Sequence, residues 1–192
     1  EEDRRRLASA VRERSKPIVV VANKADIAPP ENLRRLADSE KPVVPATADG
    51  ELALRRASAA GVVDYDPGDD DFSITGEVSD SQTAGLERIR DVIDDHGGTG
   101  VQAALNTAVY DLLDQITAYP VEDATHWTDG QGRMLPDAHL LDRGSTPLDL
   151  AYAVHSDIGD GYLHAVDARS DRRIGEDHEL SEGDVIRIVS TA

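Results

Sequence analysis

The stretch Pro17–Asp26, Pro-Ile-Val-Val-Val-Ala-Asn-Lys-Ala-Asp, decides how the rest of the chain is interpreted. Its apolar run, Ile18–Ala22, is uninterrupted and rich in β-branched residues, which is typical of a strand buried on both faces of a parallel sheet. A polar segment, residues 23–26, follows directly. Ligands of open α/β sheets bind beyond the carboxyl ends of the strands. We therefore expect a ligand-binding loop at residues 23–26.

The polar segment Asn23-Lys24-Ala25-Asp26 has the form of the guanine-specificity motif of GTPases. A carboxylate accepts two hydrogen bonds at once, and guanine offers two adjacent donors, its ring N–H and its exocyclic amine, whereas adenine offers no such pair. On this interpretation Asp26 selects guanine, Asn23 braces the loop and contacts the base edge, and the stem of Lys24 covers the base plane. The alternative is an ordinary polar turn in which Asp26 precedes the start of a helix.

A second loop is expected to complete this site. Residues 1–14, 31–38 and 49–60 are predicted to be helices, and residues 41–46 a second short strand, so the first 60 residues have the pattern of a parallel α/β sheet. Guanine sites complete the base pocket with a loop of the type Ser/Thr-Ala, whose backbone N–H meets the guanine oxygen. Thr47-Ala48 follows the second strand, where that loop belongs.

Composition sets limits on the class of protein. The 192 residues include 38 acidic and 20 basic ones, for a net charge of -18, with only three lysines and no cysteine. Diffuse acidity with little lysine predicts a salt-adapted protein whose folding salt assists, the alternative being an ordinary acidic protein. The absence of cysteine excludes disulfides, thiolate metal sites and a cysteine nucleophile. No membrane span or signal peptide is visible, so we expect a cytoplasmic protein.

The remainder of the chain changes character near residue 117. Before it we expect a turn-rich segment with a short strand at 72–74, a helix capped by Ser79 that ends near His96, and a helix Val101–Ile116 whose apolar stripe packs in the core. After it we expect a hairpin-type turn at residues 129–130, a helix capped by Thr146, and strands at 162–168 and 184–190. One helix among several strands predicts a small α+β domain of β-grasp type.

This second part resembles a known family. The segment Gly144–His155, Gly-Ser-Thr-Pro-Leu-Asp-Leu-Ala-Tyr-Ala-Val-His, looks like the signature of a TGS domain, and so do segments 173–180 and 183–189. The whole chain is similar to the carboxyl-terminal half of archaeal Obg-related GTPases of the YchF-like branch, including the segments Gly98–Gln102 and Tyr119–Asp123. The resemblance implies a remnant of a P-loop-GTPase-type α/β sheet at residues 1–60, a helical segment at 61–116 and a TGS domain at 117–192.

The same resemblance implies a function. It suggests a GTP-binding protein associated with translation, with GTP or GDP contacting Asn23, Lys24, Asp26, Thr47 and Ala48 and with the ribosome or RNA as a partner of the TGS domain. Some relatives with an altered motif prefer ATP, but this chain keeps Asp26. The base-loop motif usually ends in Lys, whereas Asp49 follows Ala48 here.

A phosphate loop is missing from this sequence. The three lysines are followed by Pro17, Ala25 and Pro42, so none occupies the Gly-Lys-Ser/Thr position that a phosphate loop requires. We expect the phosphate loop, the switch regions and the Mg²⁺ ligands to lie upstream of Glu1, and expect that these residues alone do not hydrolyse GTP. No catalytic or metal-binding residue is assigned. The alternatives are a non-hydrolysing TGS module that binds RNA, the ribosome or a regulatory partner, and a structural acidic protein with a chance motif.

Overall fold

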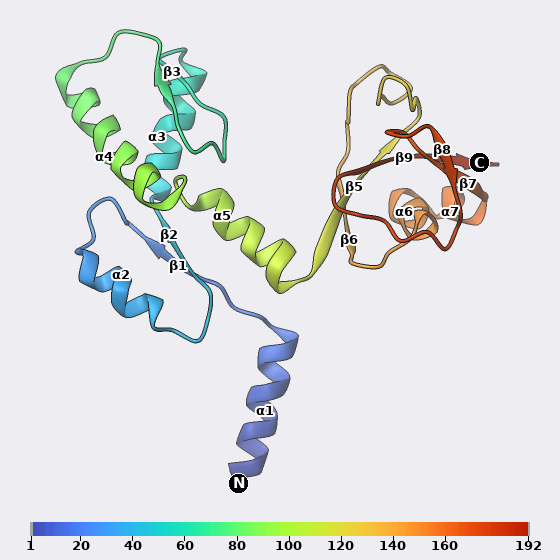
Figure 1. Cartoon of the computed structure of the whole chain (residues 1–192), viewed down its shortest axis with the longest axis horizontal. Helices are drawn as coiled ribbons and strands as arrows, with labels where there is room; N and C mark the ends of the chain where they lie inside the picture. The colour runs from blue at the N-terminus through green and yellow to red at the C-terminus, as the bar shows by residue number, and fades with distance from the viewer. Residues whose placement is uncertain (1, 192) are drawn as a thin grey trace. The chain divides into compact units, whose positions relative to one another are not determined.

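The computed structural model describes residues 2–191, apart from the side chains of residues 8–10 and 12–14. This part of the chain forms two compact units, which divide between Leu112 and Leu113 (Figure 1). Among the described residues, no helix has the length and apolar character needed to cross a membrane.

The first unit begins with a helix and a two-stranded parallel sheet. The elements are α1 (Glu2–Ser15), β1 (Val20–Asn23), α2 (Pro30–Ala37) and β2 (Val43–Ala46). The register places Asn23 beside Ala46, so both strands end at the same edge of the sheet. The predicted strand–helix–strand order is confirmed.

Burial of β1 differs from the prediction. The run Ile18–Ala22 was expected to be buried on both faces, yet only Ala22 is buried, and Ile18 and Val21 are 46% and 45% exposed. In the described chain β1 has one strand neighbour, β2, which leaves its other edge open. A strand is buried on both faces only where neighbouring elements cover it, and a two-stranded sheet cannot supply that cover.

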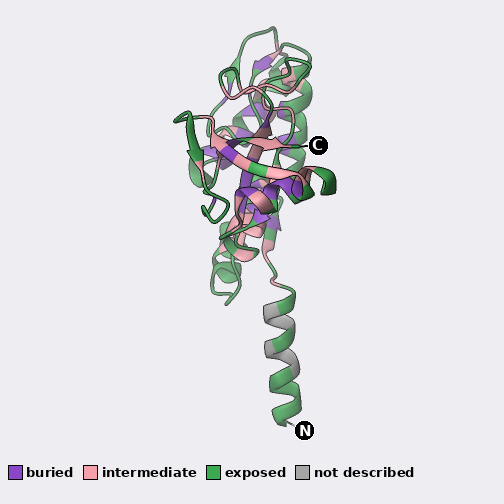
Figure 2. Cartoon of the chain, turned by 90° about the vertical axis from the view of Figure 1, so that its right-hand side faces the viewer, coloured by how far each residue is buried: buried purple, intermediate pink, exposed green. Residues whose placement is uncertain are grey.

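The hydrophobic core of the first unit lies elsewhere, between two helices and a small antiparallel ribbon. The elements are α3 (Ala48–Ala59), β3 (Val63–Asp64), β4 (Ser73–Ile74) and α4 (Asp80–His96). The buried core residues are Leu54, Val63, Tyr65, Phe72, Leu86, Ile89 and Ile93. The Arg90 guanidinium stacks on the Phe72 ring, 4.2 Å from its centroid, and its Nη2 donates to the Phe72 carbonyl. Figure 2 colours the buried positions of the chain purple.

The predicted cap of α4 is correct, and the predicted helix 101–116 is wrong in its second half. Ser79 caps α4 in a full capping box with Gln82. After α5 (Val101–Asn106) the chain continues as a π-helix (η1, Thr107–Leu112), which changes the 3.6-residue period on which the stripe depended. Only Ala104 of α5 is buried, while Leu105 is 57% exposed. Ile116 is buried in the strand that follows.

The second unit is a five-stranded mixed sheet with two short helices. The elements are β5 (Gln115–Val121), β6 (His139–Asp142), α6 (Pro147–Val154), α7 (Ser156–Asp160), β7 (Tyr162–Asp167), β8 (Arg172–Ile174) and β9 (Asp184–Ser190). The strand order is β6-β5-β9-β7-β8, with β5 and β9 parallel and the other pairs antiparallel. A helix packed on such a sheet is the predicted β-grasp arrangement. Its core is formed by Ile116, Ala118, Leu141, Leu150, Ala165, Leu180 and Ile186.

The helix α6 starts where the sequence predicted. Thr146 caps it in a capping box with Asp149, and Pro147 occupies the first turn, where a missing N–H costs nothing. The helix ends before His155, whose ring Nδ1 accepts the N–H of Asp157 and so begins α7. The TGS-like signature therefore encodes the longer of the two helices of this unit together with its two boundaries.

Candidate functional site

The loops that follow β1 and β2 are joined by one side chain. Asn23 Oδ1 accepts hydrogen bonds from the backbone N–H of Lys24 at 2.8 Å and of Ala48 at 3.1 Å. The N–H of Ala25 also donates to the Ala46 carbonyl at 2.9 Å. The two predicted loops therefore form one substructure at the carboxyl edge of the sheet.

The loop after β1 is a tight turn with an available carboxylate. Lys24 has a φ of 68°, in the left-handed region that non-glycine residues seldom occupy, and its carbonyl accepts the N–H of Ala28. Asp26 follows in this turn and is partly buried. Among the described contacts, its carboxylate has no hydrogen bond or ion pair, so both of its oxygens are available to a ligand. This fits the donor pair of a guanine base.

A cleft adjoins Asp26 on one side. It has a volume of about 360 Å³ and lies between the loop after β1, α2 and α4. Its charged lining includes Asp26, Arg34, Arg88, Asp91 and Asp95. Asn23, Thr47 and Ala48 do not line it, so this cleft is distinct from the shared edge where the two loops meet.

Thr47 and Ala48 are held from several directions. Thr47 is buried, its Oγ1 caps α3 by accepting the N–H of Gly50 at 3.2 Å, and its own N–H donates to the Thr99 carbonyl at 2.8 Å. Ala48 is exposed, and its N–H, the group expected to meet the guanine oxygen, donates to Asn23. Thr47 therefore positions the loop, and a bound base would have to share the Ala48 donor with Asn23.

The glycine run after α4 supports this loop. Gly100 has a φ of 81°, and a Cβ at this position would lie 1.9 Å from the Pro45 carbonyl oxygen and 2.7 Å from the Ala46 Cα. Only glycine permits this close approach of two backbones. In the structure this run packs against the end of β2 and supplies the Thr99 carbonyl that holds Thr47.

A buried carboxylate, Glu51, links these segments and was not singled out from the sequence. Its Oε2 accepts hydrogen bonds from the Tyr65 hydroxyl and the Thr99 hydroxyl, each at 2.6 Å, and its Oε1 pairs with Arg55 Nε. Burial by itself would raise the pKa of Glu51, but the hydrogen bonds from Thr99, Tyr65 and Arg55 outweigh it and hold the pKa below its ordinary value. Burial and the nearby carboxylate raise the pKa of Tyr65.

Sequence reasoning could not have found Glu51. An acidic residue in the first turn of a helix is usual, because it complements the helix dipole, and it gives no sign of burial. In the described part of the chain, no group of three or more His, Cys, Asp or Glu residues is placed to hold a metal ion. At one sheet edge this region presents a carboxylate, a bridging amide side chain and backbone donors to a ligand.

Comparison with known proteins gives two family matches. Residues 21–123 match the model described as "Obg-like GTPase YGR210-like, G4 motif-containing domain", and residues 131–190 match the TGS domain. The chain is similar to an uncharacterized GTP-binding protein of Methanocaldococcus jannaschii, at 43% identity over all of this chain and 50% of that protein. It is also similar to an uncharacterized GTP-binding protein of Schizosaccharomyces pombe, at 30% identity over 68% of this chain and 35% of that protein.

A solved structure agrees with these matches. The crystal structure of a GTP-binding protein from Pyrococcus horikoshii superposes with a TM-score of 0.72 at 41% identity, covering 96% of this chain and 48% of the other. The chain therefore spans about half the length of the Methanocaldococcus jannaschii and Pyrococcus horikoshii proteins.

Proposed function

Because the chain belongs to the family of Obg-like, YGR210-like GTPases and carries a TGS domain, we propose that its first unit recognises the guanine base of GTP or GDP. The observation that carries this proposal is the hydrogen bond from Ala48 N–H to Asn23 Oδ1, which joins the Asn-Lys-Ala-Asp loop to the Thr-Ala loop. This bond holds the two loops next to each other at one sheet edge, and recognition of one base by both loops requires that they be adjacent.

In this proposal each residue has a distinct role. Asp26 accepts the ring N–H and the exocyclic amine of guanine with its free carboxylate. Asn23 fixes the loop and contacts the base edge, and the exposed stem of Lys24 covers the base plane. Thr47 positions its loop from a buried place, and Ala48 presents the backbone donor. A nucleotide bound here gains its base selectivity from these residues.

The remaining functions are extensions of the same proposal. We propose that this chain is the carboxyl-terminal half of a longer protein. The phosphate loop, the switch regions and the Mg²⁺ ligands would then lie in the other half. The residues divide into a G-domain part (1–60), a helical segment (61–116) and a TGS domain (117–192). The proposal also includes three further properties of the whole protein. These are association with translation or the ribosome, location in a salt-rich cytoplasm, and contact with RNA through the TGS domain. The second candidate is a TGS binding module without nucleotide function.

A change of base selectivity tests the proposal. The whole natural protein should bind fluorescently labelled GDP far more tightly than labelled ADP. Asp26→Asn should weaken GDP binding at least tenfold and improve binding of xanthosine diphosphate, because an amide donates to the O2 of xanthine and accepts its ring N–H. Asp38→Asn, an equal charge change on an exposed residue at the end of α2, serves as the control.

The outcomes separate the two candidates. A protein that binds GDP with the same affinity in its natural form and as Asp26→Asn would refute the role of Asp26. A natural protein that binds neither GDP nor GTP would refute guanine recognition and favour the TGS binding module.

A further inference from the structure

The central strand of the second unit extends past its neighbour. β5 pairs with β9 only as far as the Val121–Arg187 pair, whereas β9 continues to Ser190, where it still pairs with β7. Beyond Val121 the chain turns away, and the N–H groups of Glu122 and Asp123 both donate to the Thr128 carbonyl. In the described chain, residues 188–190 therefore have a strand neighbour on one side only.

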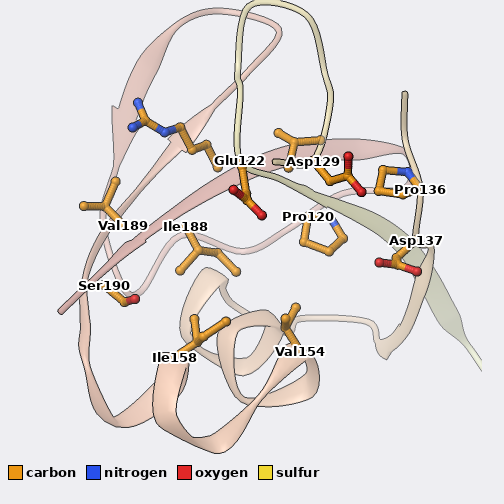
Figure 3. A pocket seen from close by; sticks show the side chains of 12 residues that line it. Pro120, Glu122, Asp129, Pro136, Asp137, Val154, Ile158, Ile188, Val189 and Ser190 are labelled. Atoms are coloured by element: carbon orange, nitrogen blue, oxygen red, sulfur yellow. The ribbon is translucent and has the colours of Figure 1, made fainter. Parts of the chain in front are cut away.

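A cleft of about 520 Å³ runs beside this open edge. Its apolar side is formed by Val154 of α6, Ile158 of α7 and Ile188 of β9, all partly exposed. Figure 3 shows Val154 and Ile158 directed from the helices toward Ile188 and Pro120. The strand edge and an apolar surface thus lie next to each other.

The opposite side of the cleft is acidic. Figure 3 shows Glu122 across the cleft from the two helices and Asp137 at one end. Asp129, which also lines the cleft, is paired with Arg133 at 2.6 Å. Neither Glu122 nor Asp137 has an ion pair or side-chain hydrogen bond among the described contacts. Arg187 supplies the single positive charge of the lining, so the cleft as a whole is acidic.

We propose that this cleft binds an extended peptide segment in which apolar residues alternate with Lys or Arg, added as a strand to the free edge of β9. A strand edge offers main-chain donors and acceptors to a peptide, and alternate side chains of that peptide point to opposite faces. Its apolar side chains would pack on Val154, Ile158 and Ile188, while its cations would face Glu122 and Asp137. The free edge of three residues spans about 10 Å, which accommodates a short strand.

The negative charge of the cleft favours a cationic peptide over a nucleic acid as its ligand. The two unpaired carboxylates of the cleft, Glu122 and Asp137, would repel phosphate groups at this place on the second unit. A cationic segment is attracted by the same charges. This proposal concerns the second unit and does not depend on guanine recognition by the first.

The binding test uses the full 192-residue chain labelled with ¹⁵N. The probes are the peptide acetyl-Lys-Val-Lys-Val-Lys-Val-amide, its Glu-Val counterpart and a single-stranded RNA hexamer. The Lys-Val peptide should shift the amide signals of residues 154, 158 and 188–190 and slow hydrogen exchange at 188–190. The same peptide with N-methyl groups on its valines should bind more weakly, because it has lost main-chain donors. Stronger effects in this cleft from the Glu-Val peptide or the RNA would overturn the proposal.

Two pairs of variants assign the binding to the cleft. The double variant Glu122→Gln with Asp137→Asn should weaken peptide binding roughly three- to tenfold and reduce its salt dependence. Ile158→Ala should also weaken it, whereas Asp177→Asn and Leu163→Ala, exposed positions outside the cleft, should not. Equal affinities for all of these folded proteins, judged by their amide spectra, would place the peptide elsewhere and refute the assignment.

Discussion

Asn23 Oδ1 accepts the backbone N–H of Ala48 at 3.1 Å, across 25 residues of sequence. Through this bond the side chain at the end of β1 fixes the conformation of the loop after β2. The same oxygen accepts the N–H of Lys24, whose left-handed backbone conformation it helps to hold. One amide side chain therefore determines the shape of both halves of the candidate site.

Replacing this side chain should loosen both loops. Asn23→Ala removes two hydrogen bonds at an exposed site and should lower the free energy of unfolding by about 1 kcal/mol. Urea denaturation followed by circular dichroism measures this effect. Asn32→Ala, an exposed asparagine in α2, is the matched control and should have little effect. A loss no greater than that of the control would show that the link contributes nothing to stability.

Gly100 and Gly97 provide a second matched pair. Both have positive φ, 81° and 73°, but an added Cβ meets Pro45 and Ala46 at Gly100 and nothing within 4 Å at Gly97. Gly97→Ala should cost about 1 kcal/mol for its backbone conformation, and Gly100→Ala about 3 kcal/mol, since steric overlap is added. Thermal unfolding of both variants checks the difference. Similar losses would mean that the glycine loop is not tightly packed on β2.

The stability of the fold should depend on pH through the ionisation of Glu51. Its pKa is lowered in the folded chain, so it stabilises the fold above its unfolded pKa, and this contribution is lost as the pH falls through the lower folded value. The natural chain should therefore exceed Glu51→Gln in stability at pH 6, and the difference should shrink as the pH falls below about 4.5. Denaturation curves between pH 6 and pH 3 test this. Glu87→Gln, an equal charge change at an exposed position of α4, is the control and should differ little from the natural chain in stability at pH 6.

Hydrogen exchange should differ between the two sheets. β1 has an open edge and an exposed Val21, whereas β5 and β9 lie inside a five-stranded sheet with a buried core. Amides of β1 and β2 should therefore exchange roughly tenfold faster or more than those paired between β5 and β9. Mass spectrometry of peptic peptides resolves the two regions. Equal protection in both would contradict the expectation that the sheet of β1 and β2 is less stable than the sheet of the second unit.

Salt should stabilise the chain. A net charge of -18 produces self-repulsion that counter-ions screen, and the screening length falls from about 10 Å at 0.1 M salt to about 3 Å at 1 M. The midpoint of thermal unfolding should rise between 0.1 M and 2 M KCl. An equal concentration of a neutral solute such as glycerol separates charge screening from general solvent effects. A falling midpoint in KCl would oppose salt adaptation.

The sequence by itself determined where most of the strands and helices lie and which residues cap the helices. The β-branched run before Asn23 predicted a strand, Ser79 and Thr146 predicted helix starts, and the strand-rich second part predicted a β-grasp sheet. These signals are local, because a cap or a strand run involves residues a few positions apart. For the same reason the prediction failed at 101–116, where the apolar period continued in sequence while the backbone changed to a π-helix and then a strand.

Only the tertiary structure decided which groups meet. Glu51 accepts the hydroxyl of Thr99 from 48 residues away, and Gly100 is required because Pro45 approaches it from another segment. The exposure of Val21 likewise depends on how many strands pair with β1, which no pattern within that strand records. Burial, pKa and close approach are properties of contacts between distant segments, so they are fixed when the chain packs and are absent from the local pattern of residues.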